Sequence, residues 1–313
     1  MAKIIVSGSV AYDRIMDYPG LFSDHILADK AHAINLSFQV ERLAVEFGGT
    51  AGNVAYTLAL LGESPEIIAT VGNDFSQYKS HLMLAGIDPK TIHTVAEEPT
   101  ASAFILTDSS DNQIAAFHMG AGSHAYDVMV DTSGRGAAIV SAGCISDMTA
   151  LPSHYRKSGL KYLYDPGQAI PVLSADVIKD GVTGAYVLFA SDYEMALINE
   201  KTGLSDNALL QLAENIVVTY GKDGSRLLTR ENDWKILPVP VARVEDPTGA
   251  GDAFRAGFIK GMMMGLPLTT CAQLGSTTAS FVVEVYGTQA HTCTLMQVAD
   301  RYKTVFGESI SLS

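Results

Sequence analysis

The segment "DPTGAGDAFRAGF", residues 246–258, combines closely spaced glycines, an aspartate and a helix-forming run. Gly249 and Gly251 allow a ligand to come close to the backbone. The N–H groups from about Ala250 to Asp252 then open a predicted helix, and a helix N-terminus suits a phosphoryl group that develops negative charge. Asp252 would lie beside that group and accept a proton from an attacking hydroxyl. A simple turn followed by a helix cap explains such a motif alone equally well.

A second glycine cluster, "FGGTAGNVA" at residues 47–55, also precedes a predicted helix. Asp13 follows the first predicted strand, and Asn53 lies near the start of the helix. An aspartate accepts hydrogen bonds from two neighbouring hydroxyls, and an asparagine amide both donates and accepts. The combination favours a sugar ring with vicinal hydroxyls, although Asn53 alone is more typical of a helix cap.

Other classes of phosphate-binding protein are disfavoured. No G-x-x-x-x-G-K-[ST] motif occurs, and Phe254 stands where the dinucleotide fingerprint needs its third glycine. The net charge of −13 and the pI near 4.9 argue against nucleic acid and anionic membranes as partners. Three scattered cysteines, no signal-like N-terminal segment and no apolar run of about 18 residues lead us to expect a cytoplasmic protein.

The elements that position these residues follow an alternating pattern. Helices are predicted over 53–62, ended by Gly62, and after Asp74 as cap, ended by Gly86. Alternation of strands and helices predicts an α/β fold with a mainly parallel sheet covered on both faces. Buried strands are predicted in these stretches: "KIIVSG", "EIIATVG", "AAIVSAG", "LKYLYDPG", "AYVLFAS" and "NIVVTYG".

Two segments break the alternation, residues 15–45 and 99–119. The first carries "HAINLSFQVE", and the second reads as a hairpin around "DSSDN". We expect them to form a small β-sheet lid outside the main domain, although an ordinary β-extension fits the pattern as well. The main α/β domain would then comprise residues 1–14, 46–98 and 120–313.

The two glycine motifs, "GGTAGNVA" and "DPTGAGDAFRAGF", together resemble the paired signatures of the ribokinase-like family (PfkB carbohydrate kinases). The similarity spans essentially the whole chain and implies a three-layer sandwich with a β-sheet lid. Further stretches, among them "LSFQVE", "DPGQ" and "SDYE", resemble the bacterial adenosine kinases of that family.

The resemblance implies roles by position. Asp252 matches the catalytic base, and an anion hole is implied for Gly249, Ala250 and Gly251. Ribose contacts are implied for Asp13, Gly48, Gly49 and Asn53, and further nucleoside contacts for Ser9 and Ser37. On the lid, Phe104 and Phe117 would stack on the base, and Gln168 would bind a polar edge of the substrate. Without the resemblance, both phenylalanines would read as core residues of a small sheet.

ATP and Mg²⁺ are the implied cofactors. The turn "TYGKDGSRLL" would place Thr219, Gly221 and Gly224 near ATP, although the same glycines suit a plain strand connection. Glu194 matches a glutamate that places Mg²⁺ through water. The family usually has asparagine where this chain has Ser191, which puts the phosphate contacts at that corner in doubt.

We therefore expect ATP-dependent phosphorylation of a nucleoside 5′-hydroxyl, with adenosine giving AMP. The alternatives are a sugar kinase acting on ribose or a fructose phosphate, and a catalytically weak nucleoside-binding protein. A phosphorylated sugar calls for cations near the lid, where only Lys30 and Arg42 occur. The resemblance also suggests a K⁺ site at Asp246 and the segment around Gly287. A homodimer is expected through the lid, because one face of the lid sheet and its edges would otherwise be exposed.

Overall fold

The computed structural model describes residues 2–25, 36–110 and 112–312. Its largest element is an eight-stranded sheet with the order β14-β13-β12-β11-β10-β9-β1-β4. The strands from β4 to β12 in this order run parallel, and β13 and β14 add antiparallel partners at one edge. The strand bounds are β1 Lys3–Ser7, β4 Pro65–Ile68, β9 Arg135–Ser141, β10 Tyr162–Asp165, β11 Val187–Ser191, β12 Asn215–Thr219, β13 Ser225–Thr229 and β14 Asp233–Ile236.

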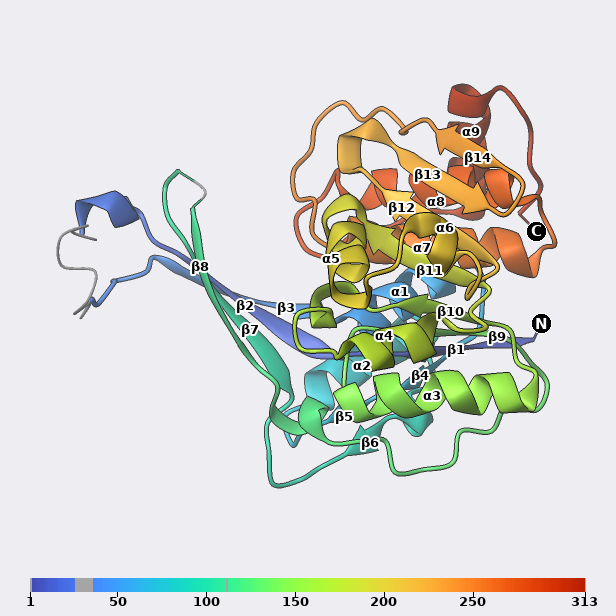
Figure 1. Ribbon diagram of the computed structural model, residues 1–313. Coiled ribbons are helices and arrows are strands. Elements are labelled where there is room, and N and C mark those ends of the chain that lie inside the picture. Colours follow the sequence, from blue (N-terminus) through green and yellow to red (C-terminus); the bar gives the residue numbers. More distant parts are fainter. Residues whose placement is uncertain (1, 26–35, 111, 313) are drawn as a thin grey trace.

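Helices cover both faces of this sheet, which confirms the predicted α/β sandwich of three layers (Figure 1). One face packs against α1 (Thr50–Leu60), α2 (Ser76–Leu84), α7 (Ala250–Met263) and α8 (Leu268–Val282). The other face packs against α3 (Ile145–Ser158), α4 (Ala175–Val182), α5 (Asp192–Thr202) and α6 (Asp206–Leu209). Helix α9 (Leu295–Phe306) lies against α8. Within the described ranges, no helix combines the length and the apolar character that crossing a membrane requires.

The short elements complete the chain. β5 (Thr70–Val71) and β6 (His93–Thr94) form a two-stranded parallel sheet. The 3₁₀ turns are η1 Phe22–Asp24, η3 Pro89–Thr91, η4 Gly120–Ser123, η5 Gly167–Ala169 and η6 Gly221–Asp223.

A separate four-stranded sheet projects from the layered body (Figure 1). It has the order β3-β2-β7-β8, with bounds β2 Ala11–Asp17, β3 Arg42–Gly48, β7 Ala101–Thr107 and β8 Gln113–His118. The hairpin expected around "DSSDN" is confirmed, and Asp108 accepts the N–H groups of Ser110 and Asn112 within it. The sheet reaches beyond the expected lid segments, because β2 begins at Ala11 and β3 ends at Gly48.

The prediction of a strand over "HAINLSFQVE" is wrong where it can be compared. Residues 32–35 lie outside the described residues, and residues 36–40 form no strand. Phe38 instead packs its ring against Tyr18, Phe22 and His25. The strand that pairs with β2 starts at Arg42, after this aromatic cluster.

The predicted helix ends are confirmed, whereas the starts differ. Gly62 and Gly86 follow α1 and α2 with φ angles of 77° and 79°, a region that favours glycine. Asp74 does not cap α2, because its carboxylate accepts the N–H of Thr100 at 2.8 Å instead. The helix predicted from Asn53 begins at Thr50.

Candidate active site

The N-terminal turn of α7 forms the centre of the candidate site. Gly249 precedes it with a φ of 80°, a left-handed conformation that glycine adopts readily. The N–H of Ala250 donates to the carbonyl of Pro247 at 3.2 Å, so this expected anion-hole donor is engaged. The N–H groups of Gly251 and Asp252 have no carbonyl partner within the helix, since the helix starts at Ala250. These two donors suit an anion best.

The Asp252 carboxyl group points toward α1. Its Oδ2 atom accepts a hydrogen bond of 2.8 Å from the Asn53 amide. Surrounding protein atoms strip water from the carboxyl group, and this burial raises its pKa to about 7. The bond from Asn53 opposes the rise in pKa, as does the positive charge of Arg255, whereas the charges of Asp165 and Glu194 add to it. A carboxyl group with such a pKa is suited to accept a proton near neutral pH.

A buried ion pair lies beneath this turn, and the sequence did not suggest it. Arg255 donates two hydrogen bonds of 3.0 Å to Asp165, and each side chain is only 6% exposed. The same guanidinium group donates to the carbonyl of Gly251 at 3.2 Å. Asp165 ends β10, so the pair ties the start of α7 to the carboxyl edge of the main sheet. The signal in the sequence for this ion pair is Arg255 itself, a charged residue on the apolar face of the predicted helix.

Asp13 and the first glycine pair meet at the base of the small sheet. Gly48 pairs with Ala11, and a Cβ atom at Gly48 would collide with the Asp13 carboxylate. Gly49 precedes α1 with a φ of 87°. Burial raises the pKa of Asp13 to about 6, and the negative charges of Asp246 and Glu46 contribute to this rise.

Ser9 has a structural role that the sequence did not reveal. Its hydroxyl accepts the N–H of Thr50 at 3.0 Å, and its own N–H donates to the Thr50 hydroxyl at 3.2 Å. A residue outside the helix thus caps α1, which explains why the helix starts three residues before Asn53. The expected nucleoside contact of Ser9 stays a prediction.

A cavity of about 640 Å³ adjoins the start of α7. It brings the expected ATP residues Thr219, Gly221 and Gly224 together with Ala250 and Gly251. The remaining walls are mainly apolar, as a flat heteroaromatic ring requires. They include Pro238, Val239, Val244, Pro247, Phe254, Ala279 and Val283.

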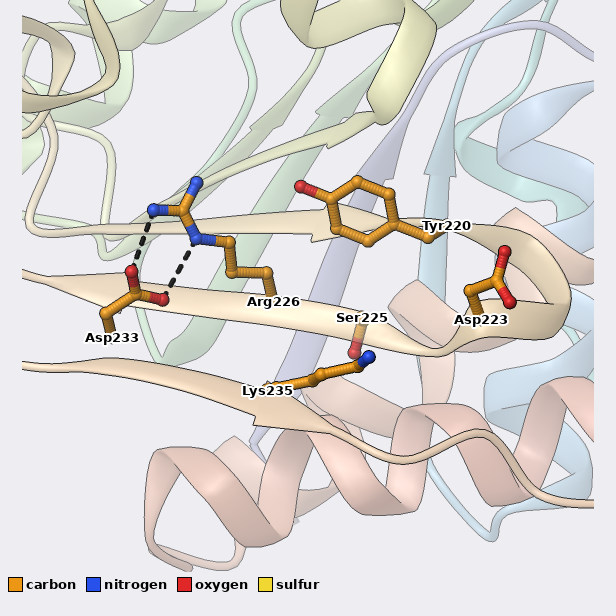
Figure 2. A pocket seen from close by; sticks show the side chains of 6 residues that line it. All are labelled: Tyr220, Asp223, Ser225, Arg226, Asp233 and Lys235. Atoms are coloured by element: carbon orange, nitrogen blue, oxygen red, sulfur yellow. Dashed lines mark hydrogen bonds and ion pairs between the residues drawn. The ribbon is translucent and has the colours of Figure 1, made fainter.

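A second, smaller cavity of about 330 Å³ lies on the strands β13 and β14 and the turn that follows β12. Figure 2 shows its lining residues, which are Tyr220, Asp223, Ser225, Arg226, Asp233 and Lys235. Arg226 donates to both carboxylate oxygens of Asp233, at 2.9 and 2.8 Å (Figure 2). The Arg226 guanidinium group is therefore already paired with Asp233. None of the expected catalytic residues lines this cavity.

Ser191 and Glu194 form a capping box at the start of α5. The Ser191 hydroxyl accepts the N–H of Glu194 at 3.3 Å, and the carboxylate of Glu194 accepts the N–H of Ser191 at 2.7 Å. In the described part of the chain, no three His, Cys, Asp or Glu side chains gather into a metal site. Mg²⁺ is commonly held by one carboxylate, waters and substrate phosphates, and the second oxygen of Glu194 fits that arrangement.

The lid register separates the two phenylalanines. Phe104 pairs with Arg14 and Ala116, whereas Phe117 pairs with Ala103, which in turn pairs with Asp13. Side chains paired across strands share a face and neighbours along a strand alternate, so Phe117 shares the face of Asp13. Phe104 lies on the opposite face, 5.8 Å from the Arg14 guanidinium group. The register therefore favours Phe117 over Phe104 for stacking on a base beside Asp13, and this stacking stays a prediction.

The other expected residues lie at different places. Gln168 is exposed in η5 and lies three residues after Asp165, the last residue of β10. Ser37 is exposed and lies beyond the Asp17–Arg42 pair, at the far end of the lid strands from Asp13, so the structure does not bring it to the site. The Asp246 carboxylate accepts the N–H groups of Thr248 and Gly287, at 2.9 and 3.1 Å.

Comparison of the sequence with known proteins shows the family to which the chain belongs. The pattern of the pfkB family carbohydrate kinases matches residues 1–294. The chain belongs to this family. The nucleoside kinase of Methanothermobacter thermautotrophicus is 34% identical over 314 residues, covering 97% of this chain and 96% of that protein.

Solved structures agree with this relationship. Burkholderia thailandensis nucleoside kinase in complex with inosine is similar to 98% of this chain and 99% of its own, with a TM-score of 0.85 and 31% identity. The nucleoside kinase of Methanocaldococcus jannaschii, a member of the ribokinase family, is similar over 97% of this chain and 99% of its own, with a TM-score of 0.88 and 28% identity. The expected ribokinase-like fold is confirmed.

Proposed function

We propose that this protein is an ATP-dependent nucleoside kinase that phosphorylates the ribose 5′-hydroxyl, with adenosine as the expected substrate and AMP as the product. One observation carries the proposal. The Asp252 carboxyl group and the open N–H donors of α7 lie between an apolar cavity with the expected ATP turn and the cluster of Asp13, Gly48 and Asn53. The names of the relatives agree with a nucleoside as acceptor.

The chemistry assigned to the chain is a proton transfer coupled to phosphoryl transfer. Asp252 accepts the proton of the 5′-hydroxyl, whose oxygen forms a bond to the γ-phosphorus of ATP. The bond to the bridging oxygen breaks and ADP leaves. The N–H groups of Gly251 and Asp252 stabilise negative charge on the transferring group. Mg²⁺, when bound, neutralises phosphate charge, and Glu194 is the side chain proposed to orient its water shell.

The nucleoside would lie against the lid face that carries Asp13. Asp13 accepts hydrogen bonds from ribose hydroxyls, and Phe117, on the same face, would cover the base. Gln168 is exposed and its amide both donates and accepts, so it suits the polar edge of adenine or of hypoxanthine. Inosine is the second candidate, since the Burkholderia relative binds it.

A sugar-phosphate kinase is the alternative within the family. Its substrate needs a cation near the sugar, but Arg42 lies 3.7 Å from Asp17, and Lys30 is outside the described residues. The hypothesis of a catalytically weak binding protein depended on the presence of Ser191 in place of asparagine. The capping box explains this serine by its structural role at the start of α5. Both observations favour the nucleoside kinase.

A coupled assay for ADP release tests the proposal with adenosine, inosine, guanosine, cytidine, ribose and fructose 6-phosphate. We expect the highest kcat/KM with adenosine and weak turnover of both sugars. A preference for ribose or fructose 6-phosphate contradicts the proposal. A preference for inosine keeps the nucleoside kinase and corrects the base. Omitting Mg²⁺ in the presence of EDTA should abolish turnover.

We also propose a K⁺ site near Asp246. The hydrogen bond from the N–H of Gly287 to its carboxylate joins the two segments that the resemblance singled out. Each carboxylate oxygen accepts only one hydrogen bond and can contact a cation as well. Equal rates in potassium and tetramethylammonium buffers would contradict this site.

The proposed homodimer uses the lid face opposite to Asp13. Four apolar side chains on that face are exposed: Leu43 by 63%, Val45 by 42%, Phe104 by 41% and Ile114 by 45%. The lid strands project away from the large helices in the single chain (Figure 1). Such a contiguous apolar surface is usually covered by a partner, and a symmetric pair is the simplest solution. Light scattering over a micromolar dilution series tests it, and a monomer at every concentration with full activity contradicts it.

A further inference from the structure

A buried glutamine connects the candidate base with the lid. Gln289 lies in the loop after α8 and is 6% exposed. Its amide nitrogen donates to the Asn53 Oδ1 atom at 3.0 Å and to the Tyr78 hydroxyl. Its Oε1 atom lies 3.0 Å from the His81 Nε2 atom. Every polar atom of the side chain thus has a partner.

The direction of each hydrogen bond follows from these partners. The Tyr78 hydroxyl donates to the carbonyl of Gly48 at 2.7 Å, so toward Gln289 it must accept. The amide nitrogen of Gln289 therefore faces Tyr78, and its oxygen is left to accept from the Nε2–H of His81. With its nitrogen also facing Asn53, Gln289 presents a donor to the Asn53 oxygen.

The same reasoning fixes Asn53. Because its oxygen accepts from Gln289, its Nδ2 group must face Asp252, where it donates at 2.8 Å. Rotation of the Asn53 amide by a half turn would place an oxygen against a carboxylate and a nitrogen against the Gln289 donor. Both contacts would be repulsive. A reversed Gln289 would remove this preference, so the orientation of Asn53 depends on Gln289.

We propose that Gln289 is a positioning residue, which holds the Asn53 amide with its donor toward Asp252 and thereby keeps the base aimed and ionised. The proposal rests on the proposed function of Asp252. Through Tyr78 the same side chain is linked to Gly48, the last residue of β3, which lies against the Asp13 carboxylate. The end of β3 and the proposed base therefore share one support.

Asp252 itself favours this orientation of Asn53, but its other charged neighbours do not act on Gln289. Asp252 also faces Asp165, Arg255 and Glu194, none of which contacts Gln289. His81 is stacked between the rings of Phe47 and Tyr56, and burial lowers its pKa, which favours the neutral form. When His81 takes up a proton at lower pH, its Nε2–H remains a donor, and the direction of the chain is unchanged.

Gln289→Glu tests the direction, because it replaces the amide donor with an acceptor of nearly the same shape. Asn53 should then turn its nitrogen toward residue 289, and Asp252 should lose its donor. Losing a donor to the charged form raises a carboxyl pKa. We expect kcat/KM at pH 7 to fall about tenfold or more and to recover toward pH 9. Gln297→Glu, at the exposed cap of α9, is the matched control and should leave the profile unchanged.

Gln289→Met serves as a second variant, which removes the donor without adding charge and remains testable if the first variant folds poorly. Its profile should move in the same direction by a smaller amount. The Asp252 pKa is also read directly, from infrared difference spectra of the carboxyl group against Asp252→Asn. An unmoved pKa in both variants, or a loss of kcat/KM equal at all pH values, overturns the positioning role. Failure of the parent protein to phosphorylate any nucleoside overturns the proposed function instead, and the infrared readout still decides on Gln289.

Discussion

The pH dependence of kcat/KM should show the two carboxyl groups of the site one after the other. Asp252 works as a base only when ionised, and its pKa is about 7 in the protein without substrates. Its ionised fraction falls from about nine tenths at pH 8 to about one tenth at pH 6. Since kcat/KM reports the groups of the free enzyme, the titration of Asp252 alone should lower it about tenfold over this range.

Below pH 6 a second group adds to the loss. The pKa of Asp13 is about 6, and a protonated Asp13 no longer accepts strong hydrogen bonds from both ribose hydroxyls. The logarithm of kcat/KM should then fall with a slope near two per pH unit instead of one. Asp13→Asn removes this second titration, so the profile of that variant should be lower but keep a slope near one.

The assay is ADP release at constant ionic strength and constant free Mg²⁺, with nucleoside well below its KM. A profile of kcat/KM that stays flat between pH 8 and pH 6 refutes Asp252 as the titrating base. A slope of two that persists in Asp13→Asn refutes the role of Asp13 as the second group.

Two further predictions concern the sugar contact and the buried ion pair. Asp13→Ala should weaken nucleoside binding by about 2–4 kcal/mol. Calorimetry should show that replacing adenosine with 2′-deoxyadenosine costs less binding free energy in the variant than in the parent. If the cost of the substitution and the cost of the missing hydroxyl simply add, Asp13 does not contact the 2′-hydroxyl. Asp165→Leu leaves the buried Arg255 cation unpaired and should lower the free energy of unfolding by about 3–5 kcal/mol in urea titrations, and adding Arg255→Met should recover most of the loss. A single variant that costs less than about 1 kcal/mol would contradict this reading of the pair.

Local patterns in the sequence predicted the main fold well. Apolar runs marked the strands β1, β9, β11 and β12, and the glycines at 62 and 86 marked helix ends. These features depend on residues close in the chain. The starts of α1 and α2 could not be predicted in this way, because the hydroxyl that caps α1 comes from Ser9 and the carboxylate of Asp74 is used by Thr100.

The candidate site shows the same division. Asp252, Gly249 and Asn53 stood out because glycine motifs surround them. Arg255 lies within the glycine motif at 246–258, but its role and the roles of Gln289 and Tyr78 depend on partners far along the chain. The Gln289–Asn53 bond joins residues 236 positions apart, and the Arg255–Asp165 bonds join residues 90 apart. Phe104 and Phe117 lie on opposite faces because of the hairpin register, and the loop sequence does not fix that register.

The most direct test of Asp252 as catalytic base is the turnover of Asp252→Asn with saturating adenosine and ATP. Asparagine keeps an oxygen for the hydrogen bond from Asn53 but accepts no proton, so adenosine affinity should stay within a few-fold of the parent. The raised pKa means that the ionised carboxylate destabilises the fold increasingly as pH rises from about 4 to about 7, so the variant should melt no lower than the parent at pH 8. We predict that kcat falls about 10²–10⁴-fold. A folded variant whose kcat lies within a few-fold of the parent would contradict the account.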